Sequence, residues 1–351
     1  MSLSNSLPNS HEALLRNRDL LTGRVALIGP ASPSILAELP AGGIAVSEHA
    51  GQVKALESQA DWQICYGYDV SALQPASCDV VSIFLPKVRA ELDLRLALAR
   101  WLGRDGATII LVGEKKEGIA GAIKQLRAVA PDAGKIDSAR HCQVWTATNS
   151  APLERFEIAD WFEWHTVSNS GVSLQIAGLP GIFSKGELDD GTARLLDSLA
   201  EAPLKASKVL DFACGAGVVG AWLQGWQAAN DKPVTPVDAV DVQYQAVTCA
   251  RATYDRAGAK GDIIASDGLS ELEGRWSAVV TNPPFHAGVK TDTSMTENFL
   301  RDVARHLTSG GELRLVANTF LPYETMIKRF VGPVERLYED RKFTVYRAVR
   351  R

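Results

Sequence analysis

The sequence predicts an α/β protein with two tandem Rossmann-like domains, each built around a doubly wound, mostly parallel sheet. Short apolar segments alternate with helical segments along the chain, as they do where helices join parallel strands. The two halves of the chain also match each other segment by segment, which indicates a duplication. In addition, 351 residues exceed what a single hydrophobic core usually supports.

The first half begins with an expected helix that Ser10 can cap and whose apolar side includes Leu14 and Leu21. A short buried strand is expected at 25–28, and it ends at the turn-forming pair Gly29-Pro30. The other expected strands are 43–46, 63–66 and 79–85, and the other expected helices are 52–58 and 88–102.

The second half repeats this order of elements. Its expected strands are 208–212, 237–242, 263–265, 277–280 and 311–316. Its expected helices are 218–226, 246–257 and 299–307. Three pairs of segments carry the internal match: 79–86 lies over 278–285, 106–113 over 311–318, and 139–147 over 339–347. The last pair has the extended pattern of an antiparallel hairpin that closes each sheet.

The match and a change in composition define the expected domains. The first domain is expected at 1–147, a linker at 148–165, and the second domain at 166–351. The aromatic segment 156–164 is expected to pack at the junction between the domains.

The two copies differ where a ligand site would lie. Cys214-Gly215-Ala216-Gly217 of the second copy corresponds to Gly29-Pro30-Ala31-Ser32 of the first. Likewise, Asn282-Pro283-Pro284-Phe285 corresponds to Ile83-Phe84-Leu85-Pro86, which lacks the amide side chain. We therefore expect the first domain to be a scaffold or RNA-docking domain that has lost the site.

Composition excludes several classes of protein. The N-terminal residues lack the features of a secretory signal, and no apolar segment reaches the ~18 residues of a membrane helix. We therefore expect a cytoplasmic protein without a membrane partner. The five cysteines are scattered without a C-x-x-C pair and the histidines have no metal spacing, so neither a disulfide framework nor a metal site is expected.

A net charge of −4 means that any binding to RNA would depend on local basic patches. Two groups of cationic residues are candidates, although each could equally be a solvated surface. They are Lys115, Lys116, Lys124 and Arg127 in the first half, and Arg336, Arg341, Lys342, Arg347, Arg350 and Arg351 in the second.

The segment 208–220 has the pattern of a strand, a tight turn and a helix. Gly215 and Gly217 allow the backbone to approach a ligand closely. With Gly220 they also form a G-x-G-x-x-G motif, followed by Asp241 after the next strand, so an NAD-dependent dehydrogenase is an alternative. Asp211 favours a different ligand, because a carboxylate at this turn suits the amino group of a methionyl moiety better than a pyrophosphate.

Two further acidic residues follow neighbouring strands. Asp241 is placed to accept hydrogen bonds from ribose hydroxyls, with Val242 packing against an adenine. Asp267, which follows Ser266 after the next strand, is placed to receive the adenine amine. The alternatives are that Asp241 caps a helix and that Asp267 is a turn residue.

The turn Asn282-Pro283-Pro284-Phe285 directly follows an expected strand, at the edge of the sheet where open α/β sheets bind ligands. The prolines fix φ and supply no N–H, so the Asn282 and Pro283 oxygens are free to accept hydrogen bonds from a planar amine. Phe285 could stack on a base that carries this amine. This chemistry suits transfer of a carbon group to an exocyclic base nitrogen. His286 is more simply explained as a structural residue.

The motif Asp211-Phe212-Ala213-Cys214-Gly215-Ala216-Gly217, followed by 282–286, resembles class I S-adenosylmethionine-dependent methyltransferases that act on exocyclic amines. Together with 179–184, 188–192 and 318–324, the duplicated layout resembles the ribosomal RNA small subunit methyltransferase C family over nearly the whole chain. The resemblance implies two class I methyltransferase domains, the first degenerate. It also implies S-adenosyl-L-methionine as cofactor and N2-methylation of a guanine of 16S rRNA in the 30S subunit. We expect a monomer.

The combined reading gives a set of expected site residues. The catalytic residues are Asn282, Pro283, Pro284 and Phe285. The cofactor-binding residues are Phe183, Thr192, Asp211, Ala213, Cys214, Gly215, Gly217, Asp241, Val242, Ser266, Asp267 and Asn282. Phe183, Ser184 and Thr192 enter through the resemblance, which implies that their segment closes over the cofactor. Ala213 stands where many methyltransferases have glycine, which is tolerable if its φ is negative.

Alternatives remain within and beyond this class. A relative of the same duplicated type methylates 23S rRNA, and an adenine-N6 methylase of DNA or a glutamine methylase could use the same turn. A dehydrogenase and a non-catalytic ribosome-binding chaperone are more distant alternatives.

Overall fold

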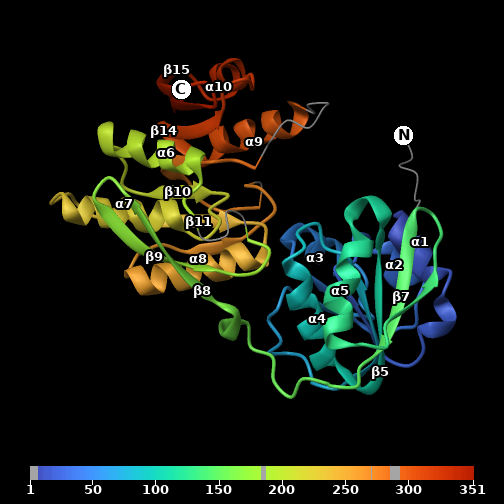
Figure 1. The fold of residues 1–351 in the computed structure, drawn as a ribbon. Coiled ribbons are helices and arrows are strands. Elements are labelled where there is room, and N and C mark those ends of the chain that lie inside the picture. The colour runs from blue at the N-terminus through green and yellow to red at the C-terminus, as the bar shows by residue number, and fades with distance from the viewer. Residues whose placement is uncertain (1–6, 183–186, 270, 285–292) are drawn as a thin grey trace. The chain divides into compact units, whose positions relative to one another are not determined.

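The computed structural model describes residues 7–182, 187–269, 271–284 and 293–351. The chain divides after Trp161 into two compact units (Figure 1), and this division lies within the segment that composition marks as a linker. The predicted positions of Phe183, Ser184, Phe285 and His286 lie outside the described residues.

The first unit is built on a seven-stranded sheet of order β3-β2-β1-β4-β5-β7-β6. The first five strands in this order are parallel, whereas β7 and β6 pair antiparallel at one edge. The strands are β1 Val25–Ile28, β2 Ile44–Ser47, β3 Gln63–Tyr66, β4 Cys78–Phe84, β5 Gly103–Glu114, β6 Gly134–Asp137 and β7 Cys142–Thr148. The α-helices are α1 Asn9–Leu15, α2 Ser34–Ala37, α3 Ala50–Leu56, α4 Glu91–Leu102 and α5 Ile119–Val129.

The second unit repeats this topology with the order β12-β11-β10-β13-β14-β16-β15, and the prediction of two doubly wound domains is therefore confirmed. Its strands are β10 Val209–Phe212, β11 Val237–Asp241, β12 Ile263–Ala265, β13 Trp276–Thr281, β14 Leu307–Asn318, β15 Val334–Glu339 and β16 Phe343–Val349. Its α-helices are α6 Asp190–Glu201, α7 Val218–Ala229, α8 Tyr244–Ala257, α9 Thr293–His306 and α10 Tyr323–Phe330. A separate hairpin, β8 Glu163–Asn169 with β9 Val172–Gly178, precedes them; neither this hairpin nor α6 was predicted.

Helices cover both faces of the second sheet, so its central strands are buried on both sides (Figure 1). Along β13, Val279 packs in one core with residues of α9 and α10. Its neighbours Ala278 and Val280 pack in the other core with residues of α6 and α7. This alternation is why the strand reads as an unbroken apolar run.

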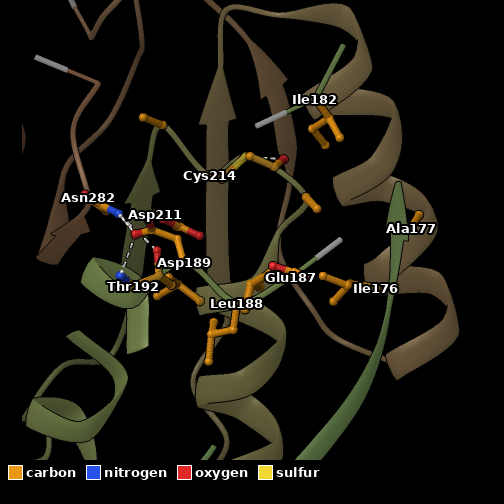
Figure 2. A pocket seen from close by; sticks show the side chains of 15 residues that line it. Ile176, Ala177, Ile182, Glu187, Leu188, Asp189, Thr192, Asp211, Cys214 and Asn282 are labelled. Carbon is orange, nitrogen blue, oxygen red and sulfur yellow. Dashed lines mark hydrogen bonds between the residues drawn. The ribbon is translucent and has the colours of Figure 1, made fainter. Parts of the chain in front are cut away.

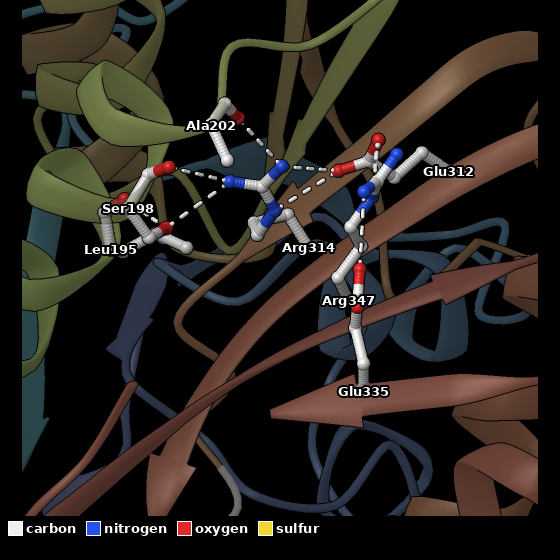
Figure 3. A network of polar contacts seen from close by, with 7 residues as sticks. All are labelled: Leu195, Ser198, Ala202, Glu312, Arg314, Glu335 and Arg347. Carbon is white, nitrogen blue, oxygen red and sulfur yellow. Dashed lines mark hydrogen bonds and ion pairs between the residues drawn. The ribbon is translucent and has the colours of Figure 1, made fainter. Parts of the chain in front are cut away.

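Arg314 is an exception to that pattern, because it is fully buried in the middle of β14 (Figure 3). Its guanidinium donates hydrogen bonds to the carbonyl oxygens of Ser198 and Ala202, at 2.9 Å each, and also binds Glu312. These carbonyls belong to the C-terminal end of α6, where a helix leaves its last carbonyls without partners. Arg314 therefore fixes α6 to the sheet at this end.

The sheets correct one part of the sequence comparison. In both units the strand pairing shifts at the same place, between Cys78 and Val80 in β4 and between Trp276 and Ala278 in β13. Val80 therefore corresponds to Ala278, whereas the sequence match had aligned Asp79 with Ala278. The same one-residue error affects the other matched segments, since Cys142 and Phe343 occupy equivalent positions in the last pair. A one-residue slip turns every side chain to the other face, so Asn282 corresponds to Phe84 and not to Ile83.

The aromatic segment 156–164 divides between the two units. Phe156 is buried in the first unit and lies near Tyr68 and Trp101, with ring centroids 6.0 and 6.5 Å away. Trp164 belongs to the second unit, where the guanidinium of Arg256 lies 3.4 Å from the centroid of its ring.

Candidate active site

Two adjoining cavities lie at the carboxyl ends of β10, β11, β13 and β14 in the second unit, which is where open α/β sheets bind ligands. Five residues line both cavities: Ile182, Asp189, Ala213, Gly215 and Asn282. The larger cavity has a volume of about 560 Å³, within the range of small-molecule sites.

Most of the predicted site residues meet here. Thr192, Asp211 and Cys214 line the smaller cavity (Figure 2). The larger cavity is lined by Asp241, Val242, Ser266, Asp267, Pro283 and Pro284. Gly217 lines neither cavity, and Phe183 and Phe285 lie outside the described residues.

Gly217 serves packing instead. It begins α7 with φ of 77°, a left-handed conformation that glycine adopts without strain. A Cβ at this position would lie 3.1 Å from backbone and side-chain atoms of Ala250 in α8. The glycine therefore allows α7 to approach α8 closely, and it sets the direction in which the turn presents Gly215.

Ala213 corrects an expectation, because its φ is +57° and not negative. The equivalent residue of the first unit, directly after β1, is Gly29, which has φ of 76°. The left-handed region is strained for alanine by about 1–2 kcal/mol. The second unit thus has a strained alanine in the wall of its cavities, at the position where the first unit has an unstrained glycine.

We expect Ala213→Gly to raise the free energy of unfolding by about 0.5–1 kcal/mol, since the relief of strain exceeds the extra entropy of an unfolded glycine. Urea denaturation checks this expectation. Ala216→Gly is the matched control: Ala216 lies in the same turn without a positive φ, so its variant should be less stable than the wild-type protein. Equal losses in both variants would show that Ala213 is not strained.

Asp211 is the most unusual group of the site. Its side chain is buried, and its Oδ2 atom has no hydrogen-bond partner among the described residues although it lines the smaller cavity. Burial, and then the nearby charge of Asp241, raise the pKa of Asp211 to about 8. An unpartnered buried acceptor is unfavourable unless a ligand supplies the donor, and a ligand ammonium group would do so.

Asp241 organises the glycine turn from the neighbouring strand. Its Oδ2 accepts a hydrogen bond from the backbone N–H of Gly215, and its Oδ1 accepts one from Gln243, both at 3.0 Å. Gln243 is the N-cap residue of α8, and among the described residues this helix has no side-chain cap hydrogen bond, so Asp241 stabilises the turn before the helix and does not cap it. A carboxylate has about four acceptor sites, so these bonds leave capacity for a ligand hydroxyl.

Asn282 has an amide whose orientation is fixed from one side. Its Nδ2 donates to Oδ2 of Asp189 at 2.9 Å and to Oγ1 of Thr192 at 3.0 Å (Figure 2). Since an ionised carboxylate only accepts hydrogen bonds, the nitrogen must point toward Asp189. The amide oxygen therefore points away from α6 and, within the described residues, is not engaged by the two contacts that hold the nitrogen.

The sequence interpretation missed the role of Asp189. This residue caps α6, because its Oδ2 also accepts the backbone N–H of Thr192 at 3.0 Å. An aspartate three residues before a threonine is a recognisable cap. Its bond to Asn282, which lies 93 residues further along the chain, has no local signal.

The corresponding edge of the first unit is filled by its own side chains. The guanidinium of Arg95 binds both carboxylate oxygens of Glu48, at 2.8 and 2.9 Å, and the carbonyl oxygen of Phe84 at 2.6 Å. It also binds Glu91 at 2.8 Å, and it packs so closely against Gly29 that a Cβ there would collide with it. By the sheet registers, Phe84 and Gly29 are the counterparts of Asn282 and Ala213.

Two more residues complete this filling. Tyr68, the counterpart of Asp267, donates its hydroxyl to Glu48 at 2.7 Å. Nε2 of His11 accepts the backbone N–H of Ala31, the counterpart of Gly215, at 3.0 Å. Burial lowers the pKa of His11 to about 4, so the ring is neutral and can accept. In the first unit, residues equivalent to cavity-lining residues of the second unit are thus bound by nearby side chains. We call the hydrogen-bonded group of Arg95, Glu48, Glu91 and Tyr68 the Arg95 network.

Within the described residues, no group of three or more metal-ligating side chains is found, and no helix is long and apolar enough to cross a membrane.

Comparisons with known proteins cover the whole chain. Residues 173–347 match the family model of the methyltransferase small domain, and residues 11–165 match that of its N-terminal domain. The chain is 41% identical over 349 residues to ribosomal RNA small subunit methyltransferase C of Hahella chejuensis, with 98% of this chain and 99% of the relative covered. It is 39% identical over 341 residues to the protein of the same name from Pseudomonas putida strain W619, with 97% and 98% covered.

One solved structure shares the whole fold. It is the 16S rRNA N2 G1207 methyltransferase of T. Thermophilus in complex with AdoMet and guanosine. The TM-score is 0.82 at 22% identity, and the match covers 98% of this chain and 92% of that one.

Proposed function

The chain belongs to the ribosomal RNA small subunit methyltransferase C family, and we propose that it transfers a methyl group from S-adenosyl-L-methionine to N2 of a guanine in 16S rRNA of the 30S subunit. One observation carries the proposal. The oriented amide of Asn282 lines both cavities, beside Asp211 in one and Asp241 in the other, and Oδ2 of Asp211 has no hydrogen-bond partner among the described residues.

The described residues fit S-adenosyl-L-methionine as a ligand. Asp211 would accept the amino group of its methionyl moiety, and Asp241 the ribose hydroxyls. Val242 and Asp267 would contact the adenine from the larger cavity. When bound, this cofactor supplies a methyl group on a sulfonium, which is already a good leaving group.

The chain itself would activate the guanine amine. The N2 lone pair is delocalised into the ring, so the nitrogen attacks only as it becomes tetrahedral. The Asn282 side-chain oxygen and the Pro283 carbonyl would accept hydrogen bonds from its two N–H groups, which favours that geometry and the positive charge that develops. As the bond from nitrogen to the methyl carbon forms, the bond from that carbon to sulfur breaks and its electron pair stays on the sulfur. The methylated nitrogen then releases one proton to solvent. Aligning the nitrogen with the methyl group provides most of the remaining rate enhancement.

The guanine must leave its stack to reach this turn, because a base stacked within an RNA helix cannot place its amine inside a cavity of the protein. We assign Phe285 the role of stacking on that base. The first unit, whose corresponding edge is filled by the Arg95 network, would serve as a scaffold or as an RNA-docking domain.

Cofactor affinity is expected to depend on pH through Asp211. The free carboxyl has a pKa of about 8, above its usual 3.8, so below pH 8 it is mostly protonated and must lose the proton to bind an ammonium group. Affinity for S-adenosylhomocysteine should therefore rise about tenfold per pH unit from pH 6 toward pH 8. It should level off there, since the Asp211 carboxyl is already ionised in the free protein above its own pKa.

Calorimetry in buffers of different ionisation enthalpy checks this, because binding at pH 7 should release close to one proton. In Asp211→Asn the affinity should be lower and the proton release absent. The raised pKa of Asp211 also affects stability without ligand. Its contribution to the free energy of unfolding should be largest at low pH and should be lost as the pH rises through about 8. Proton uptake, or no release, on binding to the wild-type protein would contradict the assignment of Asp211.

The function itself is tested by incubating the protein with labelled S-adenosyl-L-methionine and 30S subunits, naked 16S rRNA or 50S subunits, followed by nucleoside analysis. The proposal expects label in N2-methylguanosine from 16S rRNA, with 30S subunits as the preferred form. Label from 50S subunits alone would indicate the 23S rRNA alternative. Stabilisation by NAD, without any methyl transfer, would indicate a dehydrogenase.

A further inference from the structure

The turn after β14 exposes an aromatic ring close in sequence to a residue that lines the larger cavity. Phe320 is 72% exposed, more than any other large hydrophobic side chain in the part of the chain that the structure describes. It lies two residues after Asn318, the last residue of β14, which lines that cavity. A single exposed apolar side chain needs no explanation by itself, so exposure alone does not make Phe320 a binding residue. Its position two residues after the cavity-lining Asn318, which pairs across the sheet with the neighbour of the exposed cation Lys342, makes it a candidate.

Hydrogen bonds hold the backbone of this turn in place, so the position of the Phe320 Cα atom is fixed. The N–H of Thr319 donates to the carbonyl of Lys342 at 3.0 Å, and its hydroxyl donates to the carbonyl of Asp340 at 2.9 Å. On the other side, the N–H of Leu321 donates to Asn318 at 3.0 Å, and the Leu321 side chain is buried in the core.

A cation lies in the hairpin turn directly before the neighbouring strand β16. Asn318 pairs with Phe343 across the sheet, and both Lys342 and Phe343 line the larger cavity. The ammonium of Lys342 is 2.7 Å from Oδ2 of Asp190, but the two side chains are 64% and 73% exposed. Such an ion pair contributes little to stability, so the ammonium can exchange this partner for a phosphate.

We propose that Phe320 is a stacking platform for an unpaired nucleotide that neighbours the target guanine in RNA, with Lys342 beside that nucleotide's phosphate. This rests on the proposed function. Taking one base out of a stack leaves the adjacent bases without a partner, and an aromatic side chain restores stacking for any of them. The ring and the ammonium together match the two parts of a nucleotide, an aromatic face and an anion.

An apolar protein partner fits this surface less well. The residues before Phe320 are the polar Asn318 and Thr319, and the apolar Leu321 after it is buried in the core. The nearby hairpin turn carries the exposed cations Arg341 and Lys342. A protein-binding surface would surround the ring with further apolar groups and exclude charge from its centre.

The test compares methyl transfer by the full-length variants Phe320→Ala, Phe320→Leu and Phe320→Trp, with the RNA substrate that the wild-type enzyme methylates. The KM for RNA should rise at least tenfold in Phe320→Ala and Phe320→Leu, and it should stay near the wild-type value in Phe320→Trp. The kcat and the affinity for S-adenosylhomocysteine should not change. Val234→Ala is the matched control. Val234 is a 48% exposed apolar residue before β11, so it lies toward the amino ends of the parallel strands, away from the cavities.

Two further measurements separate the possible outcomes. Lys342→Gln should reduce the salt dependence of RNA binding by roughly one counterion. Fluorescence anisotropy with a labelled single-stranded oligoribonucleotide should give the same order of affinities as the KM values. A KM for Phe320→Ala within twofold of wild type would overturn the proposal, as would Phe320→Leu with wild-type KM, which would indicate an apolar protein contact. If the wild-type protein methylates no RNA, the proposed function fails, and anisotropy alone decides whether Phe320 binds a nucleotide.

Discussion

Replacing Asn282 with alanine is expected to lower the rate of methyl transfer to RNA by about 10²- to 10³-fold, which is the effect of removing one preorganised hydrogen-bonding group from a transition state. The affinity for S-adenosylhomocysteine should remain within a few-fold, because the acidic groups assigned to the cofactor are Asp211, Asp241 and Asp267. Single-turnover methyl transfer and calorimetry measure the two quantities separately. A variant that transfers methyl groups at the wild-type rate would disprove the role assigned to the amide.

Asp189→Ser provides the matched control for this experiment. Serine is as good a helix cap as aspartate, so α6 should remain intact. Its shorter side chain does not reach Nδ2 of Asn282, so the amide loses the partner that orients it. We expect a roughly tenfold lower kcat with unchanged thermal stability. If Asp189 only caps the helix, kcat will stay at the wild-type value.

Arg95→Met should have the largest effect on stability. The variant leaves Glu48 buried without its bidentate partner, and breaking a buried ion pair in this way costs about 3–5 kcal/mol. Burial also raises the pKa of Glu91 to about 7, whereas the charge of Arg95 helps to lower the pKa of Glu48, so Glu48 is the carboxylate with the greater need for compensation. Urea denaturation should show an earlier transition, and hydrogen exchange should assign it to β1 and β4.

The double variant Arg95→Met/Glu48→Gln tests the reason for that loss. It removes both charges and should recover much of the lost stability, because neutral groups are less unfavourable to bury. Thermal stabilisation by S-adenosylhomocysteine should persist in both variants, since the residues assigned to the cofactor belong to the second unit. A single variant as stable as the wild-type protein would show that the Arg95 network does not support the first unit.

The sequence indicated the general site because strands of a parallel sheet present their carboxyl ends at one edge. Asp211, Asp241 and Asn282 each follow or end a recognisable apolar run, so their convergence could be predicted without knowing any side-chain contact. Local turn chemistry likewise indicated the glycine turn, although it did not give the positive φ of Ala213, since alanine usually avoids that conformation.

What the sequence did not indicate depends on contacts between distant segments. The bond from Asn282 to Asp189 joins β13 to the start of α6, and the bond from Arg95 to Glu48 spans 47 residues. The one-residue error in the repeat match has a similar cause. Apolar residues fill both faces of these strands, so the sequence lacks the alternation that would have fixed the register.

Because of the Arg95 network, the two duplicated halves obtain the positive charge at the sheet edge in different ways. In the first, the positive charge at the sheet edge is covalently part of the polypeptide and is present as soon as that half has folded. In the second, by the assignment proposed for Asp211, the positive charge would arrive by diffusion with the methyl donor. The first half is thus complete once it has been translated and has folded. The second half would gain its last counterion only when the methyl donor, which the reaction consumes, is bound.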